Sequence, residues 1–124
     1  MAQIEERRSV RLAVVGSRTF DEYPLLKKKL DDMRKRYAVV EIVSGGAKGA
    51  DSLAARYARE NEIPLTELKP DWTRYGRAAG VLRNTDIVDQ CDVLIAFWDG
   101  TSKGTRDSIE KAERLEKETI VVEF

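Results

Sequence analysis

Histidine is absent from the sequence, and cysteine occurs once, as Cys91. The lack of histidine excludes a Ser-His-Asp triad and an imidazole general base. One cysteine can form no internal disulfide and cannot supply the usual ligands of a zinc site. We therefore expect no metal centre. We expect Cys91 to be a small buried side chain in a reducing compartment.

The chain also lacks a long apolar run and an excess of charge of either sign. No run approaches the roughly 20 apolar residues that span a bilayer, and the first eight residues carry no apolar core of a signal peptide. The 22 Lys and Arg residues balance the 22 Asp and Glu residues, so net charge indicates no nucleic-acid partner. We expect a cytoplasmic protein with no membrane partner, in which residues 1–9 form a flexible lead-in and 10–124 a single domain.

Apolar runs of strand length alternate with helical patterns along the rest of the chain. The runs predict strands at 10–15, 39–43, 63–68, 92–98 and 119–122. Four helical patterns lie between them, the second at 51–62 and the third at about 78–90. Five strands alternating with four helices predict a doubly wound α/β fold, with a mainly parallel five-stranded sheet and helices on both faces.

Several local expectations refine this scheme. Asp21 is the candidate N-cap of the first helix, and Tyr37 ends its apolar stripe. Residues 69–77 are expected to form a loop. The inward-facing positions of the last two helices are expected to be Val81, Leu82, Ile87, Val88, Ile109, Ala112 and Leu115.

A glycine-rich segment, Ser44-Gly45-Gly46-Ala47-Lys48-Gly49-Ala50-Asp51, joins the second strand to the second helix. Glycine lets the backbone turn sharply and approach a ligand, and a strand, a glycine turn and a helix start point N–H groups at an anion. The segment matches neither the dinucleotide fingerprint nor the Walker A loop. It is therefore either a cradle for phosphate or a tight turn without a ligand.

Right-handed crossovers place every strand-to-helix loop on one edge of the sheet. With strand order 3-2-1-4-5, the winding reverses between the first and fourth strands, where ligands bind in such sheets. Gly16-Ser17-Arg18 would then face Asp99-Gly100-Thr101. A second glycine loop, Gly100-Thr101-Ser102-Lys103-Gly104-Thr105, lies on the same rim and favours a phosphate ligand over two plain turns.

Side chains on this rim suit the parts of a nucleotide. Arg18, Arg77 and Arg83 are suited to phosphate, with a solvated surface charge as the alternative. Trp72 and Trp98 could stack on a base, although Trp98 could equally pack under the last helix. Without histidine, the candidate acids and bases of a reaction are Asp51, Asp71 and Asp99, and a capping or first-turn dipole role is the default for Asp51.

Four ordered motifs resemble the YspA-like (YpsA-related) branch of the SLOG superfamily, over nearly the whole chain from Val10. They are Val14–Arg18, Val43–Asp51, Asp71–Gly80 with Arg83-Asn84, and Gly100–Thr105. The resemblance implies a Rossmann-like fold and a site for nucleotides or nucleotide-derived ligands at the glycine loops. The wider superfamily includes DNA-processing DprA proteins and the LOG phosphoribohydrolases.

The match to the LOG motif P-G-G-x-G-T-x-x-E is incomplete. Ser108 stands where that motif has glutamate, so the resemblance transfers binding better than N-glycoside hydrolysis. The full set of candidate ligand-binding residues is Gly16, Ser17, Arg18, Ser44, Gly45, Gly46, Lys48, Gly49, Asp51, Trp72, Arg77, Arg83, Asn84, Trp98, Gly100, Thr101, Lys103, Gly104 and Thr105.

Three functions follow as hypotheses. The first is binding of a nucleotide-derived small molecule, with no further cofactor required. The second is an enzyme that cleaves an N-glycosidic or phosphoribosyl bond. The third is single-stranded DNA binding, which the DprA kinship suggests, the aromatic rim leaves open and the zero net charge disfavours. Apolar helix faces and kinship also predict a homodimer or larger homo-oligomer.

Overall fold

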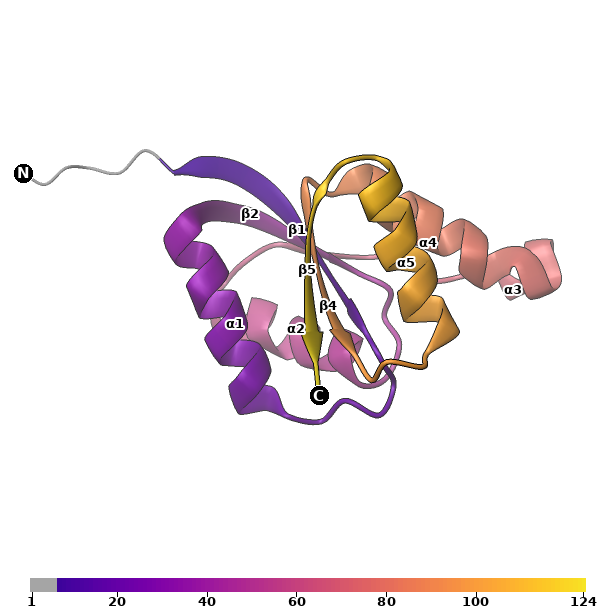
Figure 1. The fold of residues 1–124 in the computed structure, drawn as a ribbon, viewed down its shortest axis with the longest axis horizontal. Coiled ribbons are helices and arrows are strands. Elements are labelled where there is room, and N and C mark those ends of the chain that lie inside the picture. Colours follow the sequence, from indigo (N-terminus) through magenta and orange to yellow (C-terminus); the bar gives the residue numbers. More distant parts are fainter. Residues whose placement is uncertain (1–6) are drawn as a thin grey trace, which may run out of the picture.

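A computed structural model describes residues 7–124 (Figure 1). Most of the expected flexible lead-in, residues 1–6, lies outside the described residues. Its last two residues, Arg8 and Ser9, already belong to the first strand, which runs further in both directions than the apolar run.

One five-stranded sheet organises the domain. Its strands are β1 (Arg8–Gly16), β2 (Tyr37–Ser44), β3 (Leu65–Glu67), β4 (Val93–Trp98) and β5 (Glu118–Glu123). They lie in the order β3-β2-β1-β4-β5, and every neighbouring pair is parallel. The predicted doubly wound fold is confirmed, and the strand order is the one assumed for it, which places the reversal of winding between β1 and β4.

Helices cover both faces of the sheet (Figure 1). They are α1 (Tyr23–Arg36), α2 (Ala50–Glu60), α3 (Trp72–Tyr75), α4 (Ala79–Gln90) and α5 (Lys103–Arg114), with a 3₁₀ turn at Gly76–Ala78. α1 and α2 share one apolar core, and α4 and α5 share the other. None of the helices in 7–124 is long and apolar enough to cross a membrane.

The central strand β1 explains why two cores form. Alternate side chains of a strand point to opposite faces. Val10, Leu12 and Val14 therefore pack with α1 and α2, while Ala13 and Val15 pack with α4 and α5. This double burial accounts for the almost continuous apolar character of the strand.

Six local expectations were wrong. Glu22, not Asp21, occupies the N-cap position of α1, and Tyr37 begins β2. The segment expected to be a loop contains the short helix α3. Val81, Leu82 and Leu115 are 52%, 41% and 52% exposed. Leu115 follows the end of α5, and the start of α4 extends with α3 beyond the sheet (Figure 1), so no strand covers these side chains.

Lys117 closes the end of α4. Its Nζ donates hydrogen bonds to the carbonyl oxygens of Val88, Asp89 and Cys91, at 2.6, 3.3 and 2.8 Å. A cation at a helix C-terminus satisfies carbonyls that lack helical partners and opposes the negative end of the helix dipole. Cys91 itself is buried as expected, and burial raises the pKa of its thiol to about 11.

Replacing Lys117 with methionine keeps an unbranched side chain one atom shorter and removes all three hydrogen bonds. We expect Lys117→Met to lower the free energy of unfolding by about 1–3 kcal/mol, the usual range for hydrogen bonds from a charged donor. Urea denaturation measures the change. Lys35→Met is the control, because Lys35 is exposed and its ion pair with Asp32 is 3.9 Å long; a loss as large in this variant would contradict the capping role.

Candidate functional site

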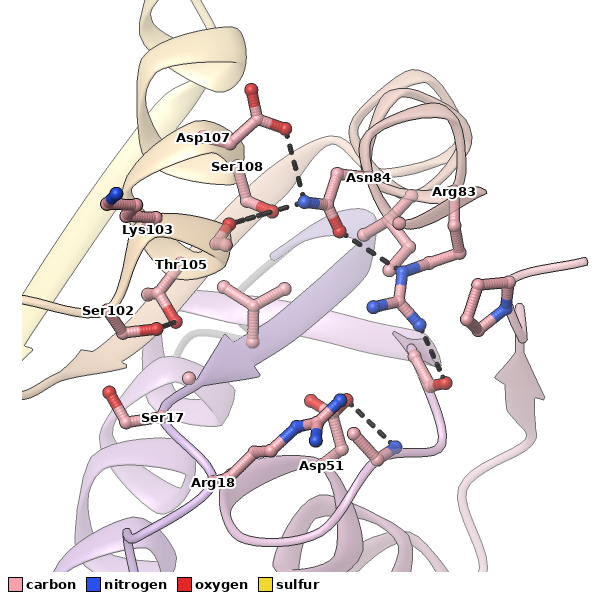
Figure 2. A pocket seen from close by; sticks show the side chains of 18 of the residues that line it. Ser17, Arg18, Asp51, Arg83, Asn84, Ser102, Lys103, Thr105, Asp107 and Ser108 are labelled. Atoms are coloured by element: carbon pink, nitrogen blue, oxygen red, sulfur yellow. Dashed lines mark hydrogen bonds between the residues drawn. The ribbon is translucent and has the colours of Figure 1, made fainter. Parts of the chain in front are cut away.

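A cavity of about 860 Å³ opens at the carboxyl edge of the sheet, within the size range of small-molecule sites. Figure 2 shows its walls: Arg18 lies in the loop after β1, Asp51 in the first turn of α2, Arg83 and Asn84 on α4, and Ser102, Lys103 and Thr105 at the start of α5. The Asp99 backbone N–H donates to Ser17 Oγ at 3.2 Å. The loops after β1 and β4 therefore face each other, as the strand order predicts.

The cavity brings together most of the residues expected on the rim. Those in its wall are Gly16, Ser17, Arg18, Gly45, Gly46, Asp51, Trp72, Arg77, Arg83, Asn84, Asp99, Lys103, Gly104 and Thr105. Those outside its wall are Ser44, Lys48, Gly49, Asp71, Trp98, Gly100 and Thr101. Ligand binding stays a prediction for the residues of both sets.

Trp98 turns toward α5 instead of the cavity. Its indole N–H donates to the Ser102 carbonyl at 3.0 Å, and the Arg106 guanidinium lies over its ring. This arrangement fits the alternative in which Trp98 packs under the last helix. Trp72 is the tryptophan in the cavity wall, and it is 55% exposed.

Several wall residues were not among the expected ones, notably Lys69, Asp107 and Ser108. Lys69 follows β3 at the start of the segment 69–77, which the sequence places on the rim, so this position could have indicated it. Asp107 and Ser108 lie one helical turn beyond the second glycine loop, so the helical period of α5 could have indicated one of them.

Two charged side chains, those of Arg83 and Asp51, lie close to the backbone of Gly45. A Cβ at this position would overlap the Arg83 guanidinium and lie 2.9 Å from Asp51 Oδ2. Arg83 Nη1 donates to the carbonyls of Gly45 and Leu68 at 2.9 and 3.2 Å. The missing side chain at Gly45 thus allows one arginine on α4 to hold the ends of β2 and β3 together.

We expect Gly45→Ala to destabilise the protein by about 1–3 kcal/mol, because the methyl group would displace Arg83 from both carbonyls. The matched control is Gly104→Ala in the first turn of α5, where a Cβ meets no atom within 4 Å. This control should be neutral or up to about 1 kcal/mol more stable, since alanine is the better helix former. Thermal denaturation measures the stability of both variants. Equal stabilities would contradict the close contact of Arg83 with Gly45.

A polar chain continues from Arg83 to the second glycine loop (Figure 2). Arg83 Nε donates to Asn84 Oδ1 at 3.1 Å, and Asn84 Nδ2 donates to the Gly104 carbonyl at 3.3 Å and to Asp107 Oδ2 at 3.1 Å. Asp107 also pairs with Lys111 at 2.9 Å. Two adjacent residues of α4 therefore connect the two glycine loops across the cavity.

The first turn of α5 presents free backbone donors to the cavity. Lys103, Gly104 and Thr105 line it, and the N–H groups of a first helical turn have no partner within the helix. Ser102 occupies the N-cap position without a capping bond, and its hydroxyl pairs with Thr105 Oγ1 at 3.2 Å. The positive end of the helix dipole therefore faces the cavity, as at an anion site.

Asp51 lies in the first turn of α2, which is one of its two default roles, and does not cap the helix, because Gly49 occupies the N-cap position. Its Oδ2 instead accepts a hydrogen bond from the Ala47 N–H at 3.1 Å and holds the glycine loop closed. Only 6% of Asp51 is exposed. Burial raises the pKa of its carboxyl, against the opposing effects of the Ala47 N–H and the Arg83 charge.

The raised pKa makes stability depend on pH. Folding favours the protonated form of Asp51. The stability that this protonated form contributes is complete below the ordinary pKa of 3.8 and is lost as the pH rises through the folded-state pKa. Asparagine cannot ionise. The free energy of unfolding of Asp51→Asn, relative to wild type, should therefore increase across that pH range, as measured by urea denaturation at stepped pH. A difference that is constant or decreases contradicts the raised pKa.

The other two candidate carboxylates order local turns. Asp99 Oδ1 accepts from the backbone N–H groups of Thr101 and Ser102 at 2.9 and 2.8 Å, and these bonds hold its pKa below the usual value. Asp71 Oδ1 accepts from the Arg74 N–H at 3.0 Å and caps α3. Asp51 is the carboxylate of the three that combines burial with a place in the cavity wall.

The charge of the wall is positive overall. Its cations are Arg18, Lys69, Arg77, Arg83 and Lys103, and its carboxylates are Asp51, Asp99 and Asp107. Burial lowers the pKa of Arg83, while Asp51 opposes that effect. Within residues 7–124, no group of three His, Cys, Asp or Glu side chains could hold a metal ion.

An all-parallel sheet with a cavity at its reversal point defines a Rossmann-like α/β protein. The model of the YspA, cpYpsA-related SLOG family matches residues 10–75, and the chain belongs to this family. The chain is also 38% identical to the Gene 61 protein of Mycobacterium phage D29, in an alignment covering 84% of this chain and 89% of that protein. The resemblance inferred from the motifs is thus confirmed.

The fold is similar to the X-ray structure of DNA processing protein A (DprA) from Streptococcus pneumoniae. The TM-score is 0.72 at 20% sequence identity, over 90% of this chain and 49% of that one. The chain therefore spans about half the length of that DprA structure. At this identity the likeness shows the fold.

Proposed function

We propose that the cavity binds a nucleotide or a nucleotide-derived small molecule, with a phosphate group at the first turn of α5. The observation that carries this proposal is the open N-terminus of α5 in the wall of a cavity at the sheet's reversal point. Backbone N–H groups and the helix dipole favour an anion there.

The other walls support the same assignment. Lys103 and Arg18 add positive charge beside the α5 turn and the β1 loop (Figure 2). Trp72 offers an exposed aromatic surface for a base. Since the whole chain carries no net charge, these cations are a local feature of the cavity.

Binding is tested with AMP, ADP-ribose, NAD and inorganic phosphate by thermal denaturation. A ligand at about 100 times its dissociation constant should add roughly 2.7 kcal/mol to the free energy of unfolding. Lys103→Met should weaken binding of the phosphate-bearing ligand about fivefold to tenfold, whereas Lys28→Met, on the exposed side of α1, should not. Absence of any shift with all four compounds would overturn the proposal.

Asp51 favours a second candidate, hydrolysis of the N-glycosidic bond of a nucleotide. A carboxylate of raised pKa in the cavity wall could take a proton from water as the water oxygen bonds to C1′. The C1′–N bond would break with its electron pair going to the base. Release of free base from AMP, measured by chromatography and lost in Asp51→Asn, would support this function; release that persists in the variant would remove Asp51 from it.

Single-stranded DNA binding and homo-oligomer formation remain predictions. The neighbouring DprA structure is named as a DNA processing protein, and it matches this chain in fold. Retention of a labelled oligonucleotide at low salt, lost as salt rises, would favour the DNA alternative. Size-exclusion chromatography against the 14.1 kDa mass of one chain tests the oligomer.

A further inference from the structure

The first glycine loop uses its own backbone donors internally. The Ala47 N–H donates to Asp51 Oδ2 at 3.1 Å, and the Ala50 N–H donates to the Ser17 carbonyl at 3.4 Å. These are two of the groups that a phosphate would need in a cradle at the start of α2. A carboxylate already lies where the loop would receive an anion, so its charge opposes phosphate there.

Asp51 has an acceptor left over. Among residues 7–124, Oδ2 receives the Ala47 N–H and Oδ1 has no hydrogen-bond partner. The side chain is 94% buried yet lines the cavity. The buried side-chain atom that lacks a partner among the described residues is the Ser44 hydroxyl beside this carboxyl, whereas Asp51 Oδ1 is not fully enclosed. An acceptor that is open to the cavity can receive a hydrogen bond from a ligand there.

Arg83 makes no ion pair with the Asp51 carboxylate. Arg83 Nη1 is used by the carbonyls of Gly45 and Leu68, and its Nε by Asn84. No ion pair within 4.0 Å joins Asp51 to an Arg or Lys side chain in the described part of the chain. Apart from the neighbouring Ser44 hydroxyl, Asp51 Oδ1 is therefore free to accept a hydrogen bond from a neutral donor or a cation of the ligand.

We propose that Asp51 Oδ1 accepts a hydrogen bond from a sugar hydroxyl of the ligand, so that the cavity prefers a nucleotide that carries this hydroxyl over one that lacks it. This inference rests on the proposed function, which puts the phosphate at α5. The two glycine loops then have different tasks. The second loop, with its open helix turn, receives the anion, and the first, closed by Asp51, receives the sugar.

The test compares AMP with 2′-deoxy-AMP and 3′-deoxy-AMP in titration calorimetry, with inorganic phosphate as the probe of the anion site. Wild type should bind AMP about 10- to 100-fold more tightly than at least one deoxy compound, since a hydrogen bond to a buried charge is lost. Asp51→Asn is the informative variant. Its amide oxygen can still accept from Ala47, while its NH₂ group replaces an acceptor with a donor.

In Asp51→Asn, the preference for AMP over the deoxy compound should fall to less than about threefold, with phosphate binding retained. Asp86→Asn is the matched control: it removes an exposed carboxylate from α4 that does not line the cavity, and it should keep the wild-type preference. If Asp51→Asn does not fold, the wild-type comparison alone decides, because equal affinities for AMP and both deoxy compounds overturn the inference.

Two further outcomes also overturn it. One is an unchanged preference in Asp51→Asn. The other is tighter phosphate binding by that variant without a change in preference, which would make the first loop an anion site. Binding of AMP without any preference rejects the sugar contact and leaves the proposed function standing. Failure of phosphate and all three nucleotides to bind, together with no shift from ADP-ribose or NAD, rejects the proposed function and the inference with it.

Discussion

The passage of Arg83 over Gly45 is the contact on which the site depends. The Arg83 guanidinium donates hydrogen bonds to carbonyl oxygens at the ends of β2 and β3. It reaches them because position 45 has no side chain. Its Nε then engages Asn84, which bonds the carbonyl of Gly104. Helix α4 thereby sets the spacing between the two glycine loops, and a small shift of this helix would alter both walls of the cavity.

The fold supplies the edge on which this contact is possible. Parallel strands bring all their carboxyl ends together, and the reversal of winding leaves a gap between the loops after β1 and β4. The hydrogen bond from the Asp99 N–H to Ser17 Oγ joins these two loops. α5 then points its free first turn into that gap, because the helix begins at Lys103, within the second glycine loop.

The two glycine loops look alike in sequence and differ in structure. Both follow a buried strand and precede a helix, so both were candidate phosphate cradles. In the first, the Asp51 carboxylate occupies a backbone donor and occludes the anion position. In the second, Asp99 lies before the loop and orders its entry, which leaves the helix turn open. The position of one aspartate relative to each loop makes this difference.

The sequence by itself determined the class of fold and the family, whereas the strand order was one assumption that the structure then bore out. The class of fold and the family follow from local periodicity, from the handedness of crossovers and from ordered motifs, none of which needs a coordinate. Only the tertiary structure decided which rim residues share the cavity, that Trp98 turns away from it, and that Val81 and Leu82 lie beyond the sheet. The reason is physical: burial and hydrogen-bond partners depend on how α4 and α5 sit on the sheet, and contacts between segments far apart in the chain set that placement.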